Sequence, residues 1–414
     1  MKLFKKALLL SFTILHLFPA FAENGINSPY TRYGFGQLSS METGTNKGMG
    51  GTGIGVQNSN QINLLNPASY AAVDTLTFLL DVGMSLSNTN LSEGTVKMNS
   101  GNTSFDYLAM QFRLVPRLGF TLSLMPFSNI GYDFSEAKPG LGDEEGDITA
   151  TNRYYGTGGL RQVTAGLGYT PFKGFSVGAN FSYIYGEIYH YIYNQYSDAN
   201  IASYTKQYRS DISTYSIDLG LQYLTHIGKS KFTVGATYQL GHAIDDEAYI
   251  IKTISANDTV STTQLSIPTA YGIGISYTYD NRLTIAADYA MQQYSTVDFF
   301  GEPGADRHRA SIGMEYIPNH ITRKIFHRAR YRAGLHYATS HYTVGSSQGP
   351  TEYGATIGIG LPIMNRWNGR SIINISGQYV HIRPNSPGMI TENTLRLNIG
   401  LSFNETWFNK WRVQ

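Results

Sequence analysis

A glycine-rich run between residues 48 and 55 is the first pattern with chemical meaning. Gly48, Gly50 and Gly53 have the G-x-G-x-x-G spacing of a dinucleotide-binding loop, and Asp74 follows at about the distance of the residue that binds the ribose. Such a loop functions between a strand and a helix, because the helix N-terminus holds the pyrophosphate. Polar residues and further glycines surround this run instead, so we expect no nucleotide cofactor.

Two acidic clusters could supply oxygen ligands to Ca²⁺. They lie in two segments that we expect to be long loops, and they comprise Asp143, Glu144, Glu145 and Asp147, and Asp245, Asp246 and Glu247. Neither cluster has the spacing of an EF-hand. Solvated acidic loops are therefore the favoured interpretation, and a surface cation site is the alternative.

Basic residues gather around the turn that follows residue 318. They are Arg323, Lys324, His327, Arg328, Arg330 and Arg332. We expect the last two to project into the interior of the molecule together with Arg309, where they pair with carboxylates. The alternative is that Arg309, Arg330 and Arg332 contact the carboxylate of a bound ligand through paired hydrogen bonds.

No catalytic arrangement accompanies these groups. The ten histidines include no HExxH spacing, no G-x-S-x-G motif occurs, and the absence of cysteine excludes disulfides, thiolate metal sites and cysteine nucleophiles. A formal net charge of +2 argues against a nucleic-acid partner. We therefore expect neither an enzyme nor a protein that holds a cofactor or a metal.

The N-terminus carries the features of an export signal. Lys2, Lys5 and Lys6 precede an apolar stretch over residues 7–18, and Ala20 and Ala22 form a small-x-small cleavage pattern. We expect residues 1–22 to be a signal peptide that is removed on export. No later stretch contains about 18 consecutive apolar residues, so membrane-spanning helices are not expected.

The composition and the periodicity both indicate strands with two different faces. Charged residues make up only 14% of the chain, against about 25% in soluble proteins. From residue 76 onward, apolar residues alternate with small or polar ones; Leu395, Leu397 and Ile399, for example, oppose Arg396 and Asn398. Because the second face stays polar along whole strands, we predict an all-β fold. It is a transmembrane antiparallel β-barrel whose apolar face meets lipid.

The pattern predicts about fourteen strands within residues 76–414. They lie near 76–88, 104–114, 117–128, 160–170, 174–190, 209–226, 231–241, 267–279, 282–294, 306–317, 327–340, 351–362, 371–384 and 391–404. Short turns alternate with longer connections, which are expected near 89–103, 129–159, 191–208, 242–266, 295–305, 341–350 and 385–390. Outer-membrane barrels have short periplasmic turns and long outer loops, so this alternation places both termini in the periplasm. Tyrosines between residues 183 and 193 are expected at the level of the lipid headgroups, as part of an aromatic girdle.

Residues 23–75 lack strand periodicity and are rich in glycine, which indicates a compact irregular segment. Fourteen strands enclose a lumen too wide for their own side chains to fill, so we expect this segment to be a hatch inside the lumen. Its flexible positions are predicted at Gly48, Gly50, Gly51, Gly53 and Gly55, and its rigid boundary at Asn66, Pro67 and Ala68.

These residues also resemble a known family. A glycine-rich run followed by Asn66, Pro67 and Ala68, just before the first strand, is similar to the hatch of the FadL/TodX outer-membrane transporters of hydrophobic compounds. Residues 267–277, 288–289, 331–337 and 358–362 are similar to strands of that family. Residues 28–34 and the tail at 407–411 resemble uncharacterised Bacteroidota members. The resemblance implies a 14-stranded barrel with an N-terminal hatch in the outer membrane of a Gram-negative cell.

Two functions remain open at this point. The first is passive uptake of hydrophobic or amphipathic small molecules, such as long-chain fatty acids, through a hatch-gated barrel surrounded by membrane lipids and lipopolysaccharide. The second is a partner-binding barrel subunit of an outer-membrane protein assembly or secretion complex. The predicted outer loops contain mainly Asn, Ser, Thr, Tyr and acidic residues. This composition weakens the first function, which needs an apolar binding surface, and keeps the second open.

Overall fold

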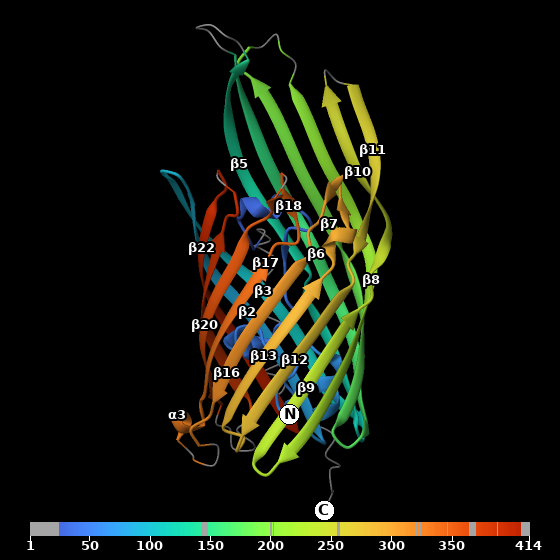
Figure 1. Cartoon of the computed structure of the whole chain (residues 1–414), viewed down its shortest axis with the longest axis vertical. Helices are drawn as coiled ribbons and strands as arrows, with labels where there is room; N and C mark the ends of the chain where they lie inside the picture. The colour runs from blue at the N-terminus through green and yellow to red at the C-terminus, as the bar shows by residue number, and fades with distance from the viewer. Residues whose placement is uncertain are drawn as a thin grey trace, which may run out of the picture.

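The computed structural model describes residues 25–406 except 142–147, 199–200, 202, 255–256, 320–321, 323, 346, 364–369 and 387. Fourteen antiparallel strands form a closed barrel, as predicted (Figure 1). In order around the ring they are β2 (Thr77–Glu93), β3 (Val96–Val115), β4 (Leu118–Pro126), β6 (Ile148–Phe172), β7 (Phe175–Tyr196), β8 (Tyr204–Ile227), β9 (Ser230–Gln239), β12 (Ala270–Tyr279), β13 (Leu283–Gln292), β16 (Arg307–Tyr316), β17 (Arg330–Thr339), β20 (Thr351–Pro362), β21 (Ile372–Arg383) and β22 (Thr391–Thr406). Pairing of β22 with β2 closes the ring.

The two faces of the wall follow the predicted alternation. Leu395 and Leu397 point outward and are 62% and 41% exposed, whereas Asn398 is buried on the inner face. Exposed tyrosines lie near both ends of the strands. Tyr183, Tyr185, Tyr215, Tyr238, Tyr271, Tyr289, Tyr337, Tyr353 and Tyr379 form an upper girdle, and Tyr169, Tyr223, Tyr279, Tyr316 and Tyr331 form a lower girdle next to the short turns. On β12 the two girdles are separated by about 26 Å of strand, which is on the scale of the apolar band of an outer-membrane barrel.

Several segments that were expected to be long loops are strands instead, so this part of the prediction is wrong. β5 (Ser128–Leu141) pairs with the upper part of β6, and β10 (His242–Ile254) pairs with β8 and with β11 (Asn257–Ile267). Together with β6, β7 and β8 they form a wall that rises above the barrel on one side, called the upper wall here (Figure 1). Its outer face carries exposed charged pairs such as Asp133 with Arg153. Because charged residues occupy that face, these strands lack the apolar alternation by which membrane strands are recognised in a sequence.

The other long connections also contain paired residues. The segment expected as the loop 89–103 is the hairpin end of β2 and β3. The connection after β13 contains β14 (Asp298–Phe299) and β15 (Glu302–Pro303), and the one after β17 contains β18 (Thr343–Val344) and β19 (Ser347–Gln348). In the part of the chain that the structure describes, no helix has the length and apolarity needed to cross a bilayer.

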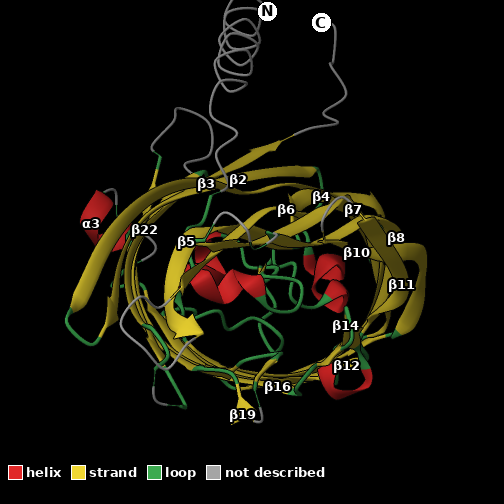
Figure 2. Ribbon diagram, turned by 90° about the horizontal axis from the view of Figure 1, so that it is seen from above, coloured by secondary structure: helices red, strands yellow, loops and turns green. Residues whose placement is uncertain are grey.

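The segment before β2 lies inside the ring of strands (Figure 2). It contains η1 (Pro29–Arg32), β1 (Gln37–Leu38), α2 (Gly44–Gly48) and η2 (Pro67–Ala72). Each turn starts at a residue suited to that position: the side chains of Ser28 and Asn66 cap η1 and η2, and proline follows both of them. We call residues 25–76 the interior segment.

The barrel wall is interrupted between β3 and β5. β4 pairs with β3 only as far as Leu108, and after Pro126 the chain turns inward as β5, whose edge pairs with β1 (Figure 2). The start of the interior segment spans this interruption. The Asn27 side chain donates to Ser100 on β3 at 2.9 Å, and the Ser28 N–H donates to the carbonyl of Gly131 on β5 at 3.0 Å.

Candidate functional site

Inward-facing glycines of the barrel strands contact the interior segment directly. Gly178 on β7 lies against Pro67, and Gly334 on β17 lies against Gly50. A Cβ atom at either glycine would lie closer than 3.0 Å to the backbone of the interior segment. The same holds around the ring, and we call the whole set the glycine belt: Gly119, Gly168, Gly178, Gly235, Gly274, Gly313 and Gly334. Glycine is required at these positions because two backbones approach each other without intervening side chains.

The glycines predicted as flexible positions take part in the same packing. Gly50 and Gly51 have φ values of 69° and 82°, a conformation that strongly favours glycine. Gly48 lies against Arg332, Gly53 against Asn46 and Asn63, and Gly55 against the backbone of Gly274. Close packing and two left-handed residues therefore account for the glycine run, whose role in gating stays a hypothesis.

Buried hydrogen bonds join the interior segment to the wall. The Asp288 carboxylate on β13 accepts from the N–H groups of Gly53 and Ile54 at 2.6 and 2.8 Å. Asn66, which is fully buried, donates from its side chain to the carbonyls of Ile54 and of Leu221 on β8, at 2.9 and 3.1 Å. Pro67 and Ala68 follow inside η2 and are also buried.

The three arginines proposed as ligand contacts are all held by carboxylates. Arg309 forms an ion pair with Glu42 of the interior segment at 2.6 Å. Arg330 and Arg332 both contact Glu315 on the neighbouring strand, at 3.0 and 2.7 Å. Burial alone would raise the pKa of Glu42, but the guanidinium of Arg309 holds that pKa below its usual value. The Glu42 carboxylate is therefore charged at neutral pH.

Cavities remain between the interior segment and the wall, and two of them exceed 100 Å³. The larger has a volume of about 210 Å³ and is lined by apolar side chains such as Leu64 and Phe127 together with charged groups such as Asp218 and Arg309. The second has about 120 Å³ and lies beside Lys47 and Arg396, near the wall interruption. Both are below the range of about 300–1,000 Å³ that is usual for sites of drug-sized ligands.

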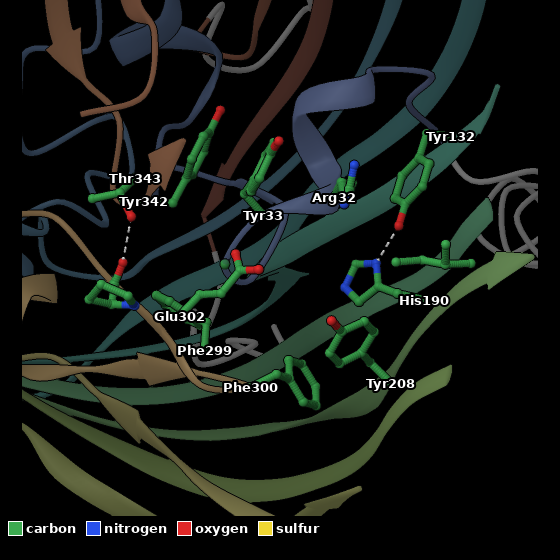
Figure 3. Close-up of a pocket in the computed structure, with 13 residues that line it drawn as sticks. Arg32, Tyr33, Tyr132, His190, Tyr208, Phe299, Phe300, Glu302, Tyr342 and Thr343 are labelled. Atoms are coloured by element: carbon green, nitrogen blue, oxygen red, sulfur yellow. Dashed lines mark hydrogen bonds between the residues drawn. The ribbon is translucent and has the colours of Figure 1, made fainter. Parts of the chain in front are cut away.

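An aromatic pocket lies above these cavities, at the base of the upper wall (Figure 3). Its free volume is only about 40 Å³. Tyr33 stacks on Tyr342 with ring centroids 5.2 Å apart, and the Tyr132 hydroxyl and His190 Nδ1 are hydrogen-bonded at 2.8 Å. Arg32 lies on one side of the pocket, with its guanidinium 4.2 Å from the ring centroid of Tyr154. Aromatic rings therefore line the pocket beside the charges of Arg32 and Glu302, but in this conformation its volume is too small for a further aromatic ring.

An apolar cluster next to this pocket was missed by the sequence analysis. Phe35 of the interior segment packs there with Ile184 and Ile188 of β7, and Tyr294 and Phe299 close the cluster from the β13–β16 connection. Inward-facing isoleucines at and above the level of the upper girdle are a signal that could have revealed it, because the inner face changes there from polar to apolar. The chain's own side chains fill this apolar compartment.

Those of the remaining candidate groups that the structure describes do not form a site. The acidic residues 143–147 and Arg323 lie outside the described residues. Asp246 accepts from the Ser213 N–H at 2.5 Å, and among the described residues no group of three or more potential ligands could hold a metal.

The glycine motif also differs from a dinucleotide-binding loop. Gly48 ends α2 rather than opening a helix, and Asp74 lies 3.9 Å from Arg370. The context required for dinucleotide binding is therefore missing here.

Solved structures of outer-membrane transporters share this fold. A FadL homologue from Pseudomonas aeruginosa has a TM-score of 0.60 at 12% identity, covering 90% of this chain and 100% of that one. The toluene transporter TbuX from Ralstonia pickettii gives 0.56 at 15% identity, covering 87% and 97%. The toluene transporter TodX from Pseudomonas putida gives 0.55 at 14%, covering 90% and 100%. The resemblance to the FadL/TodX proteins is thus confirmed for the fold.

Comparison of the sequence with family models gives a match to a family other than the FadL/TodX proteins. A family model described as BamG matches residues 3–414, which is nearly the whole chain. No curated protein matches it significantly.

Proposed function

The chain belongs to the BamG family, and from this membership and its closed interior we propose that it is a partner-binding barrel subunit of an outer-membrane protein assembly complex. We place the barrel in the outer membrane, with residues 1–22 removed on export and both termini in the periplasm. Neither this function nor the alternative below needs catalysis or a cofactor.

The close packing of the interior segment against the wall is the observation that carries this proposal. A hatch that opens must separate from the glycine belt, break the hydrogen bonds of Asp288 and split the Glu42–Arg309 pair. Each buried polar group left without a partner costs about 1–3 kcal/mol. Several such losses together make opening rare, so the interior segment acts as a permanent plug. Partners then bind to the outer surfaces of the protein and not to its lumen.

Passive uptake of hydrophobic small molecules is the second candidate, and two observations favour it. The fold is that of proteins described as hydrocarbon channels, and the aromatic pocket lies at the outer mouth, where an apolar ligand would first bind. Under this candidate, the glycines from Gly48 to Gly55 allow the interior segment to move. Arg309, Arg330 and Arg332 would then exchange their carboxylate partners for those of the ligand.

Purification from native membranes tests the two candidates together. The tagged full-length chain is isolated in mild detergent, and its proteins and lipids are identified by mass spectrometry, with an unrelated barrel of similar abundance as the control. We expect a component of the barrel-assembly machinery in stoichiometric amount, and lower levels of other outer-membrane barrels when the chain is depleted. Recovery of the chain alone, carrying an apolar small molecule, would contradict the assembly function and support uptake.

A further inference from the structure

A short helix lies outside the barrel wall at the end that carries the short turns. α3 (Ile325–Arg328) belongs to the connection between β16 and β17 and packs against β20 (Figures 1 and 2). Its apolar residues are not covered: Phe326 is 68% exposed and Ile325 is 43% exposed. The Tyr331 hydroxyl donates to the Phe326 carbonyl at 3.1 Å, so the helix lies at the level of the lower girdle.

The position of α3 is fixed by hydrogen bonds at its base. Arg282 on the neighbouring turn donates to the Ile317 carbonyl at 3.4 Å, and the Asn319 N–H donates to the His327 carbonyl at 2.8 Å. These bonds hold the connection against the outside of the barrel. The two apolar side chains therefore continue the lipid-facing surface of the wall.

The charged residues of the connection that contains α3 are all basic. Residues 317–332 contain no acidic residue, and Lys324 and His327 are exposed beside the apolar side chains. A helix with basic and apolar side chains at a membrane boundary binds the interface, with cations at the lipid phosphates and apolar groups among the acyl chains. Lysine attracts anionic lipid by about 1 kcal/mol per residue near the surface.

We propose that α3 with Lys324 is a binding site for anionic phospholipid in the leaflet that borders the short turns. The lipid phosphate contacts Lys324 and His327, and the acyl chains lie along Ile325 and Phe326. A lipid fits better than a periplasmic protein because the helix rests on the lipid-facing side of β20. The proposal depends on the barrel being in a membrane and not on the assembly function.

Native mass spectrometry of the purified full-length chain tests the site. The detergent-solubilised protein is titrated with phosphatidylglycerol and, separately, with phosphatidylcholine. We expect tighter binding of phosphatidylglycerol, and an affinity about fivefold weaker in Lys324→Ser. Lys229→Ser is the matched control, because Lys229 is also exposed, in the β8–β9 turn, and no described helix lies in that turn.

Phe326→Ser separates the apolar contact from the charge. It should weaken the binding of both lipids, while the faster gel mobility of the folded barrel shows that the variant still folds. Equal affinity for phosphatidylglycerol in the wild type, Lys324→Ser and Lys229→Ser would overturn the proposal. Loss of a copurifying protein from Lys324→Ser, with lipid binding unchanged, would overturn it in favour of a protein contact.

Discussion

At the scale of single residues, the glycine belt accounts for seven of the glycines in the strands of this barrel. Glycine within a strand is normally destabilising, because it has more conformational freedom to lose on folding. Here the missing side chain leaves room for another backbone, as at Gly178 against Pro67. The belt thus makes the inner wall complementary to the interior segment.

Gly178→Val tests the belt. The added methyl groups collide with Pro67 and Ala68, so we expect the free energy of unfolding to fall by about 1–3 kcal/mol. The interior segment should also become more sensitive to protease. Gly377→Val is the control, because a Cβ at Gly377 has no atom within 4 Å. Equal effects of the two substitutions in urea unfolding would show that the belt does not hold the segment.

Glu42→Gln tests the ion pair with Arg309. The change leaves a guanidinium in an interior site, where its side chain is only 17% exposed, and removal of one partner of a buried pair costs about 3 kcal/mol. Because the pKa of Glu42 is depressed in the folded protein, the pair stabilises the fold at pH values above the usual carboxylate pKa. This stabilisation is lost as the pH falls through the lower pKa of Glu42 in the folded state. We expect Glu42→Gln to remove this acid-dependent loss of stability. In Glu42→Gln/Arg309→Met part of the stability should return, and a double variant no more stable than the single one would contradict this account.

At the scale of elements, the interior segment and the strands have separate tasks. The strands present the apolar outer surface and close the ring through the β2–β22 pairing. The interior segment fills the space that fourteen strands leave open. One part can therefore be removed while the other is retained.

Deletion of residues 26–70 should leave a barrel that still inserts and shows the gel mobility of a folded barrel. Planar-bilayer recordings of this variant should show large open-channel conductance, because water fills the vacated lumen. The wild-type protein should stay closed under the same conditions. A deletion variant that folds but conducts no more than the wild type would mean that the interior segment does not seal the lumen.

The sequence predicted the barrel strands better than the segments beyond them. A strand that crosses a membrane must have one apolar face along its whole length. Apolar residues such as Leu395 and Leu397 therefore recur at every second position, which is visible in the sequence. In the upper wall the outer face carries charged residues such as Asp133 and the inner face packs on Phe35, so β5, β10 and β11 lack that pattern. The contacts of Arg309 and Asp288 with the interior segment join residues more than 200 positions apart, and no local pattern in a single sequence encodes them.

At the scale of the whole molecule, the central claim is that this barrel is permanently closed and acts through its outer surfaces. The uptake candidate requires the interior segment to move in each transport cycle, whereas the assembly candidate requires no movement. A covalent link between the segment and the wall therefore separates the two. The chain contains no native cysteine that would interfere with an engineered disulfide.

Gly48→Cys/Arg332→Cys provides that link. A Cβ at Gly48 would lie 3.5 Å from the Cβ of Arg332, which is within the range for a disulfide, and the oxidising periplasm favours its formation. The decisive measurement compares partner recovery, the level of other outer-membrane barrels and the entry of an apolar probe in cells with the oxidised and the reduced double variant. Our account predicts the same values for both, with each single-cysteine variant as a control for loss of the native side chain. Loss of function in the oxidised form, restored by a reductant, would show that the segment must move and would contradict the account.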